Sequence, residues 1–345
     1  MTVTGFLRTS GEASSVARPS LDTDQLAVLA LPDDASAAVI GAPGTGKTRT
    51  LVELVADRVE RAGFLPEQVL ALTASRTTAT RLRDILALRL GVPTNGPLAR
   101  TVNSLAFDIV GHAARVAGTE PPRLVTGGEQ DSDLSQLLDG QLLDGQLLDG
   151  QLGDGTAPAW PEHLGPQVRR LRGFRSELRE LMARATEYGV SPEQLRQLGL
   201  RNDRPEWVAA SEFISEYLGV ISSSRPHQLD SAELVQFAVA ALAGDDPGLT
   251  VSRLRLVVVD DLQEATASTL SLLRALAARG IAVVAFGNPD VAANAFRGGE
   301  PDALGRLATV LNVPGLATIA LRTNHRSGHA LTALTSRVTE RIGTA

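Results

Sequence analysis

One eight-residue segment constrains the fold of this chain more than any other. Residues 41–48 read GAPGTGKT and satisfy the pattern G-x-x-x-x-G-K-[ST]. An apolar run at 37–40 precedes the segment and predicts a buried parallel strand, and apolar residues at helical spacing follow it from Leu51 to Val59. A strand, a glycine-rich turn and a helix in this order predict a phosphate-binding loop (P-loop) in an α/β protein.

Each residue type in this loop has a physical role. Glycines let backbone N–H groups close around phosphates at a helix N-terminus, where the helix dipole favours negative charge. We expect Lys47 to reach the β- and γ-phosphates of a nucleotide and the Thr48 hydroxyl to ligate Mg²⁺. The predicted nucleotide ligands in the loop are Gly41, Ala42, Pro43, Gly44, Thr45, Gly46, Lys47 and Thr48. Lys47 is the single lysine among the 33 lysines and arginines of the chain.

The second half of such a site is an acid at the end of a neighbouring strand. Residues 254–260 read LRLVVVD, an apolar run that ends in Asp260, and Asp261 follows directly. We expect Asp260 to bind Mg²⁺ and Asp261 to orient the attacking water. The alternative is a plain turn made by two adjacent aspartates.

The apolar spacing divides the chain into four parts. We expect a disordered tail at 1–20, the first part of the sheet domain at 21–112, an inserted all-helical subdomain at 113–245, and the second part of the sheet domain at 246–345. Strands are predicted at 37–40, 69–73, around Val102, 254–260, 281–286 and 317–321. Helices are predicted in the insertion at 168–186, 192–198, 206–221 and 231–242, and a last helix is predicted from about Gly328.

A five-residue repeat interrupts this pattern. Residues 136–155 read QLLDG three times and then QLGDG. Because a glycine at every fifth position disfavours a helix, and the period is far shorter than that of a solenoid, we expect a flexible low-complexity loop at 126–160. A partner-binding segment is the alternative.

Composition narrows the possible functions. A net charge of −6 argues against coating of nucleic acid through bulk positive charge, although six arginines between Arg169 and Arg184 could form a local phosphate-binding helix or a solvated face. The absence of cysteine excludes disulfides and cysteine-ligated metals. His325 and His329 are four residues apart, but without further nearby ligands they do not predict a metal site. With no signal peptide and no long apolar run, we expect a cytoplasmic protein without membrane contact.

The motifs, taken in chain order, resemble those of the UvrD/Rep-type superfamily 1 DNA helicases. The segments that carry the resemblance are LDTDQ at 21–25, GKTRTL at 46–51, LALTASRTTA at 70–79, ARTVNSLAF at 99–107, DDLQ at 260–263, FGNPDVAANAFRGG at 286–299 and LRTNHRS at 321–327. The resemblance implies that Gln25 reads adenine, that Arg49 and Gln263 belong to the nucleotide site, and that Arg326 touches the γ-phosphate. It also implies a RecA-like P-loop NTPase sheet, domain 1A, with the helical subdomain 1B inserted into it.

The sequence departs from the family pattern at several positions. The family usually has glutamate at the position of Asp261, an aromatic residue and a lysine at the positions of Ala74 and Thr77, and histidine at the position of Asn103. In the 286–299 motif it usually has glutamine and an aromatic residue where Val291 and Asn294 stand. Because stacking contributes about 1–3 kcal/mol per base, the missing aromatics predict a weak grip on single-stranded DNA. The sequence therefore predicts intact nucleotide binding and weakened DNA binding.

The resemblance sets the functional expectation. It implies the N-terminal, ATP·Mg-binding motor domain of a DNA repair or recombination helicase, with Lys47, Asp260, Asp261 and Arg326 in catalytic roles. Motifs V and VI and the second RecA-like domain, 2A, are absent from these residues, so we expect ATP binding without DNA unwinding by the 345 residues alone. The eroded motifs are similar to those of the weaker motor in paired helicase–nucleases of the AdnAB type, which implies single-stranded DNA and a second helicase–nuclease subunit as partners. The alternatives are a vestigial motor with a structural role and a P-loop phosphotransferase or GTPase unrelated to DNA.

Overall fold

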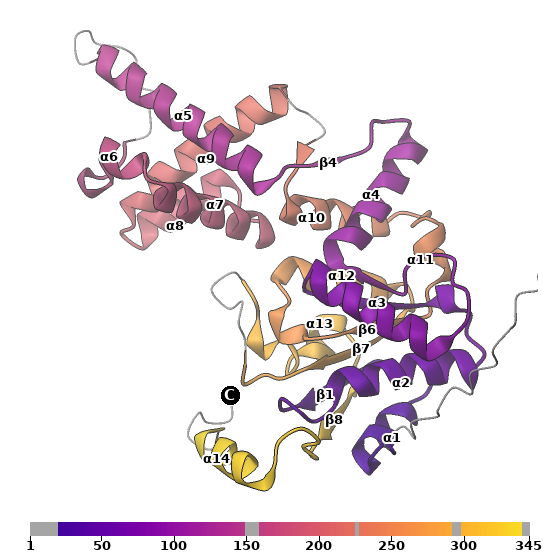
Figure 1. The fold of residues 1–345 in the computed structure, drawn as a ribbon. Coiled ribbons are helices and arrows are strands. Elements are labelled where there is room, and N and C mark those ends of the chain that lie inside the picture. Colours follow the sequence, from indigo (N-terminus) through magenta and orange to yellow (C-terminus); the bar gives the residue numbers. More distant parts are fainter. Residues whose placement is uncertain (1–19, 149–158, 225–227, 292–297, 340–345) are drawn as a thin grey trace, which may run out of the picture.

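A six-stranded parallel sheet forms the centre of the molecule (Figure 1). The computed structural model describes residues 20–148, 159–224, 228–291 and 298–339. The strands are β1 (Ala37–Gly41), β2 (Val69–Thr73), β3 (Ala99–Thr101), β6 (Leu256–Val259), β7 (Ala282–Gly287) and β8 (Ala317–Leu321), in the spatial order β3-β2-β6-β7-β1-β8. Since every pairing is parallel, all six carboxyl ends lie at one edge of the sheet. The α/β class and parallel sheet predicted from the sequence are confirmed.

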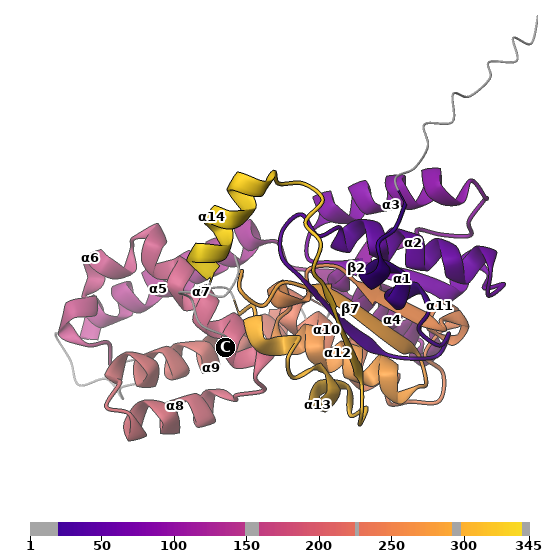
Figure 2. The same cartoon turned by 90° about the horizontal axis from the view of Figure 1, so that it is seen from below.

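Helices cover both faces of this sheet (Figure 2). On one face lie α1 (Thr23–Leu29), α2 (Lys47–Glu60) and α3 (Arg76–Leu90); on the other lie α4 (Val102–Ala117), α10 (Ser231–Leu242), α12 (Ala267–Ala278) and α13 (Leu307–Leu311). Successive strand residues alternate between the two cores: Leu256 and Val258 face the α2 side, and Val257 and Val259 face the α12 side. Burial on both faces explains why these strands read as continuous apolar runs.

A separate group of helices lies beside the sheet domain, apart from its strands in Figure 1. It contains α5 (Gly127–Leu148), α6 (Pro166–Arg169), α7 (Arg172–Glu187), α8 (Pro192–Arg201) and α9 (Pro205–Ser224). Its own hydrophobic core is built around Phe213, Leu134 and Leu178. We call α5–α9 the helical cluster. Short parallel strands β4 (Arg123–Leu124) and β5 (Gln228–Leu229) join where the chain enters and leaves it.

The remaining elements are short or peripheral. They are η1 (Pro66–Gln68), η2 (Glu162–Leu164), α11 (Leu249–Arg253), η3 (Leu262–Glu264), η5 (Pro301–Ala303) and α14 (His329–Thr339). The predicted tail at 1–20 lies outside the described residues except for its last position. None of the helices within the described ranges is long and apolar enough to cross a membrane.

The repeat region differs from the prediction. Helix α5 covers 127–148, much of the segment expected to be a flexible loop at 126–160, and residues 149–158 lie outside the described part. Leu134 and Leu138 are buried in the core of the helical cluster, and the Gln141 amide donates to Glu216 Oε2 at 2.6 Å. Each glycine costs a helix about 1 kcal/mol, which burial of even one leucine offsets. The expectation of a loop was therefore wrong for this part.

Three boundaries also differ from the prediction. The third strand ends at Thr101, whose hydroxyl accepts a hydrogen bond from Ser104 N at 3.2 Å and caps α4, so Val102 starts a helix. The helix predicted at 168–186 is two helices, α6 and α7. Helix α10 lies inside the predicted insertion at 113–245, yet Leu234 and Ala238 pack into the sheet core together with α4 and α12. The cluster with its own core is therefore shorter than predicted.

The N-terminus of α10 gives a first testable prediction. Asp230 Oδ1 accepts from Ala232 N at 2.7 Å and Glu233 N at 2.8 Å, but burial raises the pKa of Asp230, so its charge is disfavoured in the folded state. Asparagine keeps the acceptor without the charge. At neutral pH, we expect the free energy of unfolding of Asp230→Asn to equal or exceed that of wild type. The free energy of unfolding of Asp230→Ala should be about 1 kcal/mol below that of wild type.

The pH dependence distinguishes charge from capping. The raised pKa means that wild type loses stability as pH rises from the ordinary value of 3.8 through the folded-state pKa, whereas the amide of the Asp230→Asn variant does not titrate. Urea denaturation between pH 4 and 8 should show the advantage of Asp230→Asn growing with pH. Equal losses in the Asp230→Asn and Asp230→Ala variants at pH 7 would contradict this account.

Candidate functional site

The predicted phosphate loop lies between β1 and α2, at the carboxyl edge of the sheet. Gly44 has φ +94° and Gly46 has φ +85°, a left-handed conformation that glycine adopts without strain. A Cβ on Gly41 would collide with Thr45 Oγ1, so the loop folds back closely over its own first residue, Gly41. Helix α2 begins at Lys47, which turns its first N–H groups toward the loop. The loop has the form of an anion cradle.

The Lys47 ammonium lies across the inside of this loop. Its Nζ donates to Gly41 O at 2.6 Å and to Ala42 O at 3.2 Å. Burial lowers the pKa of Lys47, Asp261 and Asp260 raise it, and Arg326 lowers it. The predicted catalytic residues Lys47, Asp260, Asp261 and Arg326 are therefore close enough to influence one another electrostatically.

The end of β6 places the first aspartate beside the loop. Thr48 Oγ1 donates to Asp260 Oδ2 at 3.1 Å, which joins two residues 212 positions apart. The other carboxylate oxygen, Asp260 Oδ1, is buried with no hydrogen-bond partner among the described residues. Burial, and then repulsion by Asp261, raise the pKa of Asp260 to about 6. An orphaned acidic oxygen beside a hydroxyl fits a hard divalent cation, since Mg²⁺ prefers oxygen ligands.

The second aspartate is held by Gln263 of η3, which is itself bonded to the segment after β7. Asp261 has φ +55°, and its Oδ1 accepts from Gln263 Nε2 at 3.2 Å. Gln263 Oε1 in turn accepts from Asn288 N at 3.0 Å, just after β7. Gln263 is only 5% exposed, and its hydrogen bond supports the Asp261 carboxylate from the protein interior. Its role as a nucleotide ligand stays a prediction. Sequence reasoning missed Asn288, although it lies in the GNPD segment of the 286–299 motif.

The N-terminal segment also braces the phosphate loop. The Gln25 side chain is 0% exposed: its Nε2 donates to Thr45 O at 3.3 Å, and its Oε1 accepts from Asp22 N at 3.1 Å. Both ends of the amide are thus bonded to protein, and the prediction that Gln25 reads adenine stays untested. Arg49 lies in the first turn of α2, two residues beyond Lys47.

The segment after β8 folds onto the same loop. His325 N donates to Gly44 O at 2.9 Å, and Asn324 Nδ2 donates to Pro43 O at 3.3 Å. His325 Nε2 also lies 2.8 Å from Asp22 Oδ2. Arg326 N donates to Asn324 Oδ1 at 2.9 Å, which fixes the backbone of Arg326 beside the loop. Sequence reasoning missed Asn324, His325 and Asp22, although two of them stand in the polar TNHRS segment.

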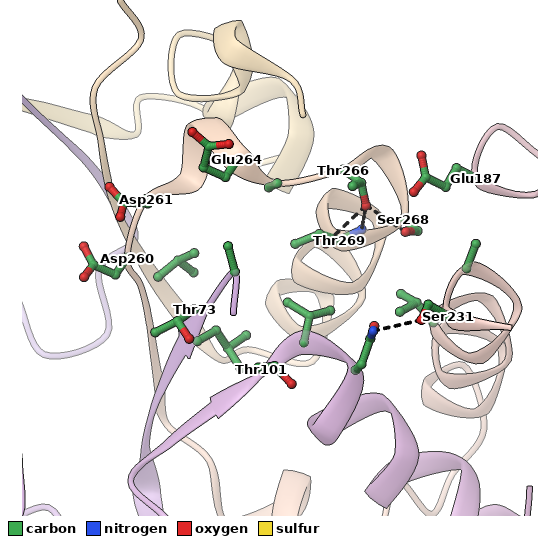
Figure 3. A pocket seen from close by; sticks show the side chains of 18 residues that line it. Thr73, Thr101, Glu187, Ser231, Asp260, Asp261, Glu264, Thr266, Ser268 and Thr269 are labelled. Carbon is green, nitrogen blue, oxygen red and sulfur yellow. Dashed lines mark hydrogen bonds between the residues drawn. The ribbon is translucent and has the colours of Figure 1, made fainter. Parts of the chain in front are cut away.

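A cavity of about 280 Å³ adjoins the aspartates, where β2, β3 and β6 end and α10 and α12 begin. Figure 3 shows Asp260 and Asp261 at one side of it and Glu187 at the other, with the hydroxyls of Thr266, Ser268 and Thr269 between them. Of the residues that depart from the family pattern, Ala74, Asn103 and Asp261 line this cavity. Asn103 Nδ2 donates to Ser231 Oγ at 3.1 Å.

The arginines of the predicted basic helix have partners inside the protein. Arg175 donates to Asp131 at 3.0 Å, and Arg179 donates to Gly127 O at 3.0 Å, so both tie α7 to the start of α5. Arg169 lies over the Trp160 ring at 5.9 Å. These contacts favour a structural role for the run. Within the described ranges, no group of three or more His, Asp or Glu residues could hold a metal ion.

Two comparisons bear on this site. The family model described as the UvrD/REP helicase N-terminal domain matches residues 21–310, which include the phosphate loop, both aspartates and the helical cluster. No curated protein matches the chain.

Proposed function

Since the chain belongs to the UvrD/REP helicase family, we propose that its sheet domain is the ATP-binding motor domain of an ATP-dependent DNA helicase. The observation that carries this proposal is the junction between loop and acid, where Thr48 Oγ1 bonds Asp260 Oδ2 while Asp260 Oδ1 has no partner among the described residues. UvrD-like helicases use ATP with Mg²⁺, and the oxygen donors here suit that ion.

The position of each site residue gives its role in binding or hydrolysis of the nucleotide. The glycine-rich loop and the α2 N-terminus bind the phosphates, and Lys47 and Arg326 neutralise their charge. Thr48 and Asp260 hold Mg²⁺, which neutralises phosphate charge when bound. Asp261, supported by Gln263, orients the attacking water and accepts its proton. Gln25 and Arg49 complete the nucleotide side of the pocket.

Hydrolysis drives movement along single-stranded DNA together with a second RecA-like domain. We place subdomain 1B of this motor in the helical cluster α5–α9. The narrower proposal is a motor in a paired helicase–nuclease of the AdnAB type, with a second subunit as partner, in DNA repair or recombination. Ala74 and Asn103, on the cavity wall next to the aspartates, predict a weak grip on the strand.

Two departures from the family pattern favour a second candidate function. Asp261 is one methylene shorter than the family's glutamate, and Val291 stands, exposed, where the family has glutamine. The second candidate is therefore a nucleotide-binding subunit with a weakened motor, which serves mainly as a structural part of the helicase–nuclease.

Equilibrium binding of a fluorescent ATP analogue, with and without Mg²⁺, tests the proposed site. We expect ATP to compete better than GTP. Mg²⁺ should increase the affinity for ATP, and in Asp260→Asn this increase should be smaller by roughly tenfold or more, because even the outer partners of metal ligands have effects of this size. The control is Asp290→Asn, which removes an exposed acid near the same sheet edge. Preference for GTP, or an unchanged Mg²⁺ effect in Asp260→Asn, would refute the assignment.

A further inference from the structure

The segment between β8 and α14 is bonded to two acids at the start of α1. His325 Nε2 lies 2.8 Å from Asp22 Oδ2, and Arg322 N donates to Asp24 Oδ2 at 2.9 Å. Arg322 Nη1 also donates to Asp24 Oδ1 at 3.5 Å. The two pairs join residues that are 303 and 298 positions apart. Carboxylates of the N-terminal segment therefore hold the chain as it leaves the last strand of the sheet.

The same segment also packs against the phosphate loop. His325 N donates to Gly44 O at 2.9 Å. A Cβ on Gly44 would lie 2.6 Å from Asn324 Oδ1 and 3.0 Å from Arg326 Cβ, so the loop and the segment approach each other closely at this glycine. Arg326 directly follows His325, and its N–H donates to Asn324 Oδ1 at 2.9 Å. A shift of His325 would therefore move Arg326 relative to the loop.

Asp22 connects this segment to the glutamine that braces the loop. Asp22 Oδ1 accepts from Gln25 N at 2.8 Å, and Gln25 Oε1 accepts from Asp22 N at 3.1 Å. Gln25 Nε2 in turn donates to Thr45 O at 3.3 Å. Because His325 N is bonded to the neighbouring Gly44 O, a closed ring of contacts runs from Asp22 through Gln25 and the loop to His325, and from His325 back to Asp22.

Charge strengthens the contact between Asp22 and His325. Burial raises the pKa of Asp22, but the hydrogen bonds from Gln25 N and His325 lower it by more, so the carboxylate is charged in the folded protein. A charged acceptor makes a shorter and stronger hydrogen bond than a neutral one. The Asp22 side chain is only 18% exposed, which limits competition from water. One carboxylate thus serves two partners, with Oδ1 on Gln25 and Oδ2 on His325.

We propose that Asp22 is a positioning residue for the terminal phosphate of ATP, because it holds His325, and with it Arg326, against the phosphate loop. Asp22 acts through Arg326, since both of its carboxylate oxygens are bonded to protein. The charge of Arg326 lowers the pKa of Lys47, which indicates that the guanidinium lies toward the phosphate-binding lysine. The proposed function uses Arg326 to neutralise phosphate charge, and the inference rests on that proposal to this extent.

Equilibrium binding of ADP and of a non-hydrolysable ATP analogue, both with Mg²⁺, tests the role of Asp22. In Asp22→Ser the single hydroxyl can still cap α1 but cannot also reach His325. We expect the affinity for the analogue to fall roughly tenfold, as loss of a charged hydrogen bond predicts, and the affinity for ADP to stay unchanged. The matched control is Asp34→Ser, an exposed acid in the turn after α1, which should bind both nucleotides as wild type does.

Two further variants separate positioning from general loss of structure. Asp22→Asn should restore binding of the analogue, because its amide oxygen caps Gln25 N while its N–H group donates to a neutral imidazole. In a His325→Ala background, Asp22→Ser should have no further effect on either nucleotide. Equal weakening of ADP and the analogue in Asp22→Ser, or additive effects of Asp22→Ser and His325→Ala, would overturn the proposal.

Hydrogen exchange of the full chain without nucleotide tests the contact independently of ATP. The amide to follow is that of His325, which donates to Gly44 O. We expect Asp22→Ser to speed its exchange roughly tenfold and to leave the Gln25 amide, still capped by serine, unchanged. Unchanged exchange at His325 would overturn the positioning role. A wild-type chain that binds neither nucleotide refutes the proposed function and the phosphate role with it, whereas the exchange result decides whether Asp22 holds the segment.

Discussion

Replacing Lys47 with alanine is expected to lower ATP binding and hydrolysis by roughly 100- to 1,000-fold, the usual cost of removing a charged donor from a preorganised site. The ammonium lies inside the loop, 2.6 Å from Gly41 O, and the charges of both aspartates raise its pKa. Lys47→Arg should fail as well, because a planar guanidinium cannot take the place of a compact ammonium in this cradle. Equilibrium ATP binding and steady-state turnover of the two variants measure the effect.

The composition of the chain makes this prediction unusually easy to check. Because Lys47 is the only lysine, an amine-reactive reagent can label only its side chain and the terminal amine. Burial lowers the pKa of Lys47, which increases its reactive neutral form, and ATP with Mg²⁺ should protect it. Arg61→Ala, at the exposed C-terminal end of α2, is the control and should bind ATP as wild type does. Wild-type affinity in Lys47→Ala, or labelling that ATP does not slow, would contradict the assignment.

The sheet was predictable because its strands are buried on both faces. β2 and β8 have the predicted bounds, and β1, β6 and β7 differ from prediction by only a few residues. The third strand was misplaced because Ala99–Thr101 is three residues long and contains Arg100, so it has no apolar run to detect. Its end is set by the Thr101 cap, a local signal that the apolar pattern does not contain.

The helices were predictable in type but less so in their packing. Apolar spacing shows that α10 has a buried face, but it does not say that this face packs against α4 and α12 of the sheet domain. The glycines of the QLLDG repeat predict a loop on local propensity alone. Helix α5 forms because Leu134 and Leu138 find partners on α7 and α9, which are distant in sequence. Tertiary burial here outweighs local preference.

The site shows the same division between local and distant information. The phosphate loop and the aspartate pair were predictable because each is a short motif at the end of a strand. The partners of Gln25 and Gln263 were not, because a glutamine amide can bond a nucleotide or the protein equally well. Which partner the amide bonds depends on segments that the fold brings together, such as the segments of Asp22 and His325, which are 303 positions apart.

Replacing Asp261 with glutamate is expected to raise ATP turnover by up to about 100-fold, since a misplacement near 1 Å costs about that factor. The added methylene moves the carboxylate toward the water that it should orient. Gln263 Nε2, now 3.2 Å from the carboxylate, lies on a buried side chain that supports either acid. Turnover with saturating ATP·Mg and single-stranded DNA measures kcat, and KM for ATP should change little because Asp261 binds no phosphate.

A panel at this one position also separates the two candidate functions. In a working motor, Asp261→Asn removes the base and should lower kcat by roughly 100-fold or more. In a structural subunit with a vestigial site, neither Asp261→Asn nor Asp261→Glu should change the rate at which the assembled complex unwinds DNA. The control is Asp290→Glu, at an exposed position after β7, which lengthens an acid without approaching the site. If Asp261→Glu hydrolyses ATP no faster than wild type while Asp261→Asn is inactive, aspartate already has the correct reach, and the shorter side chain is no sign of a weakened motor.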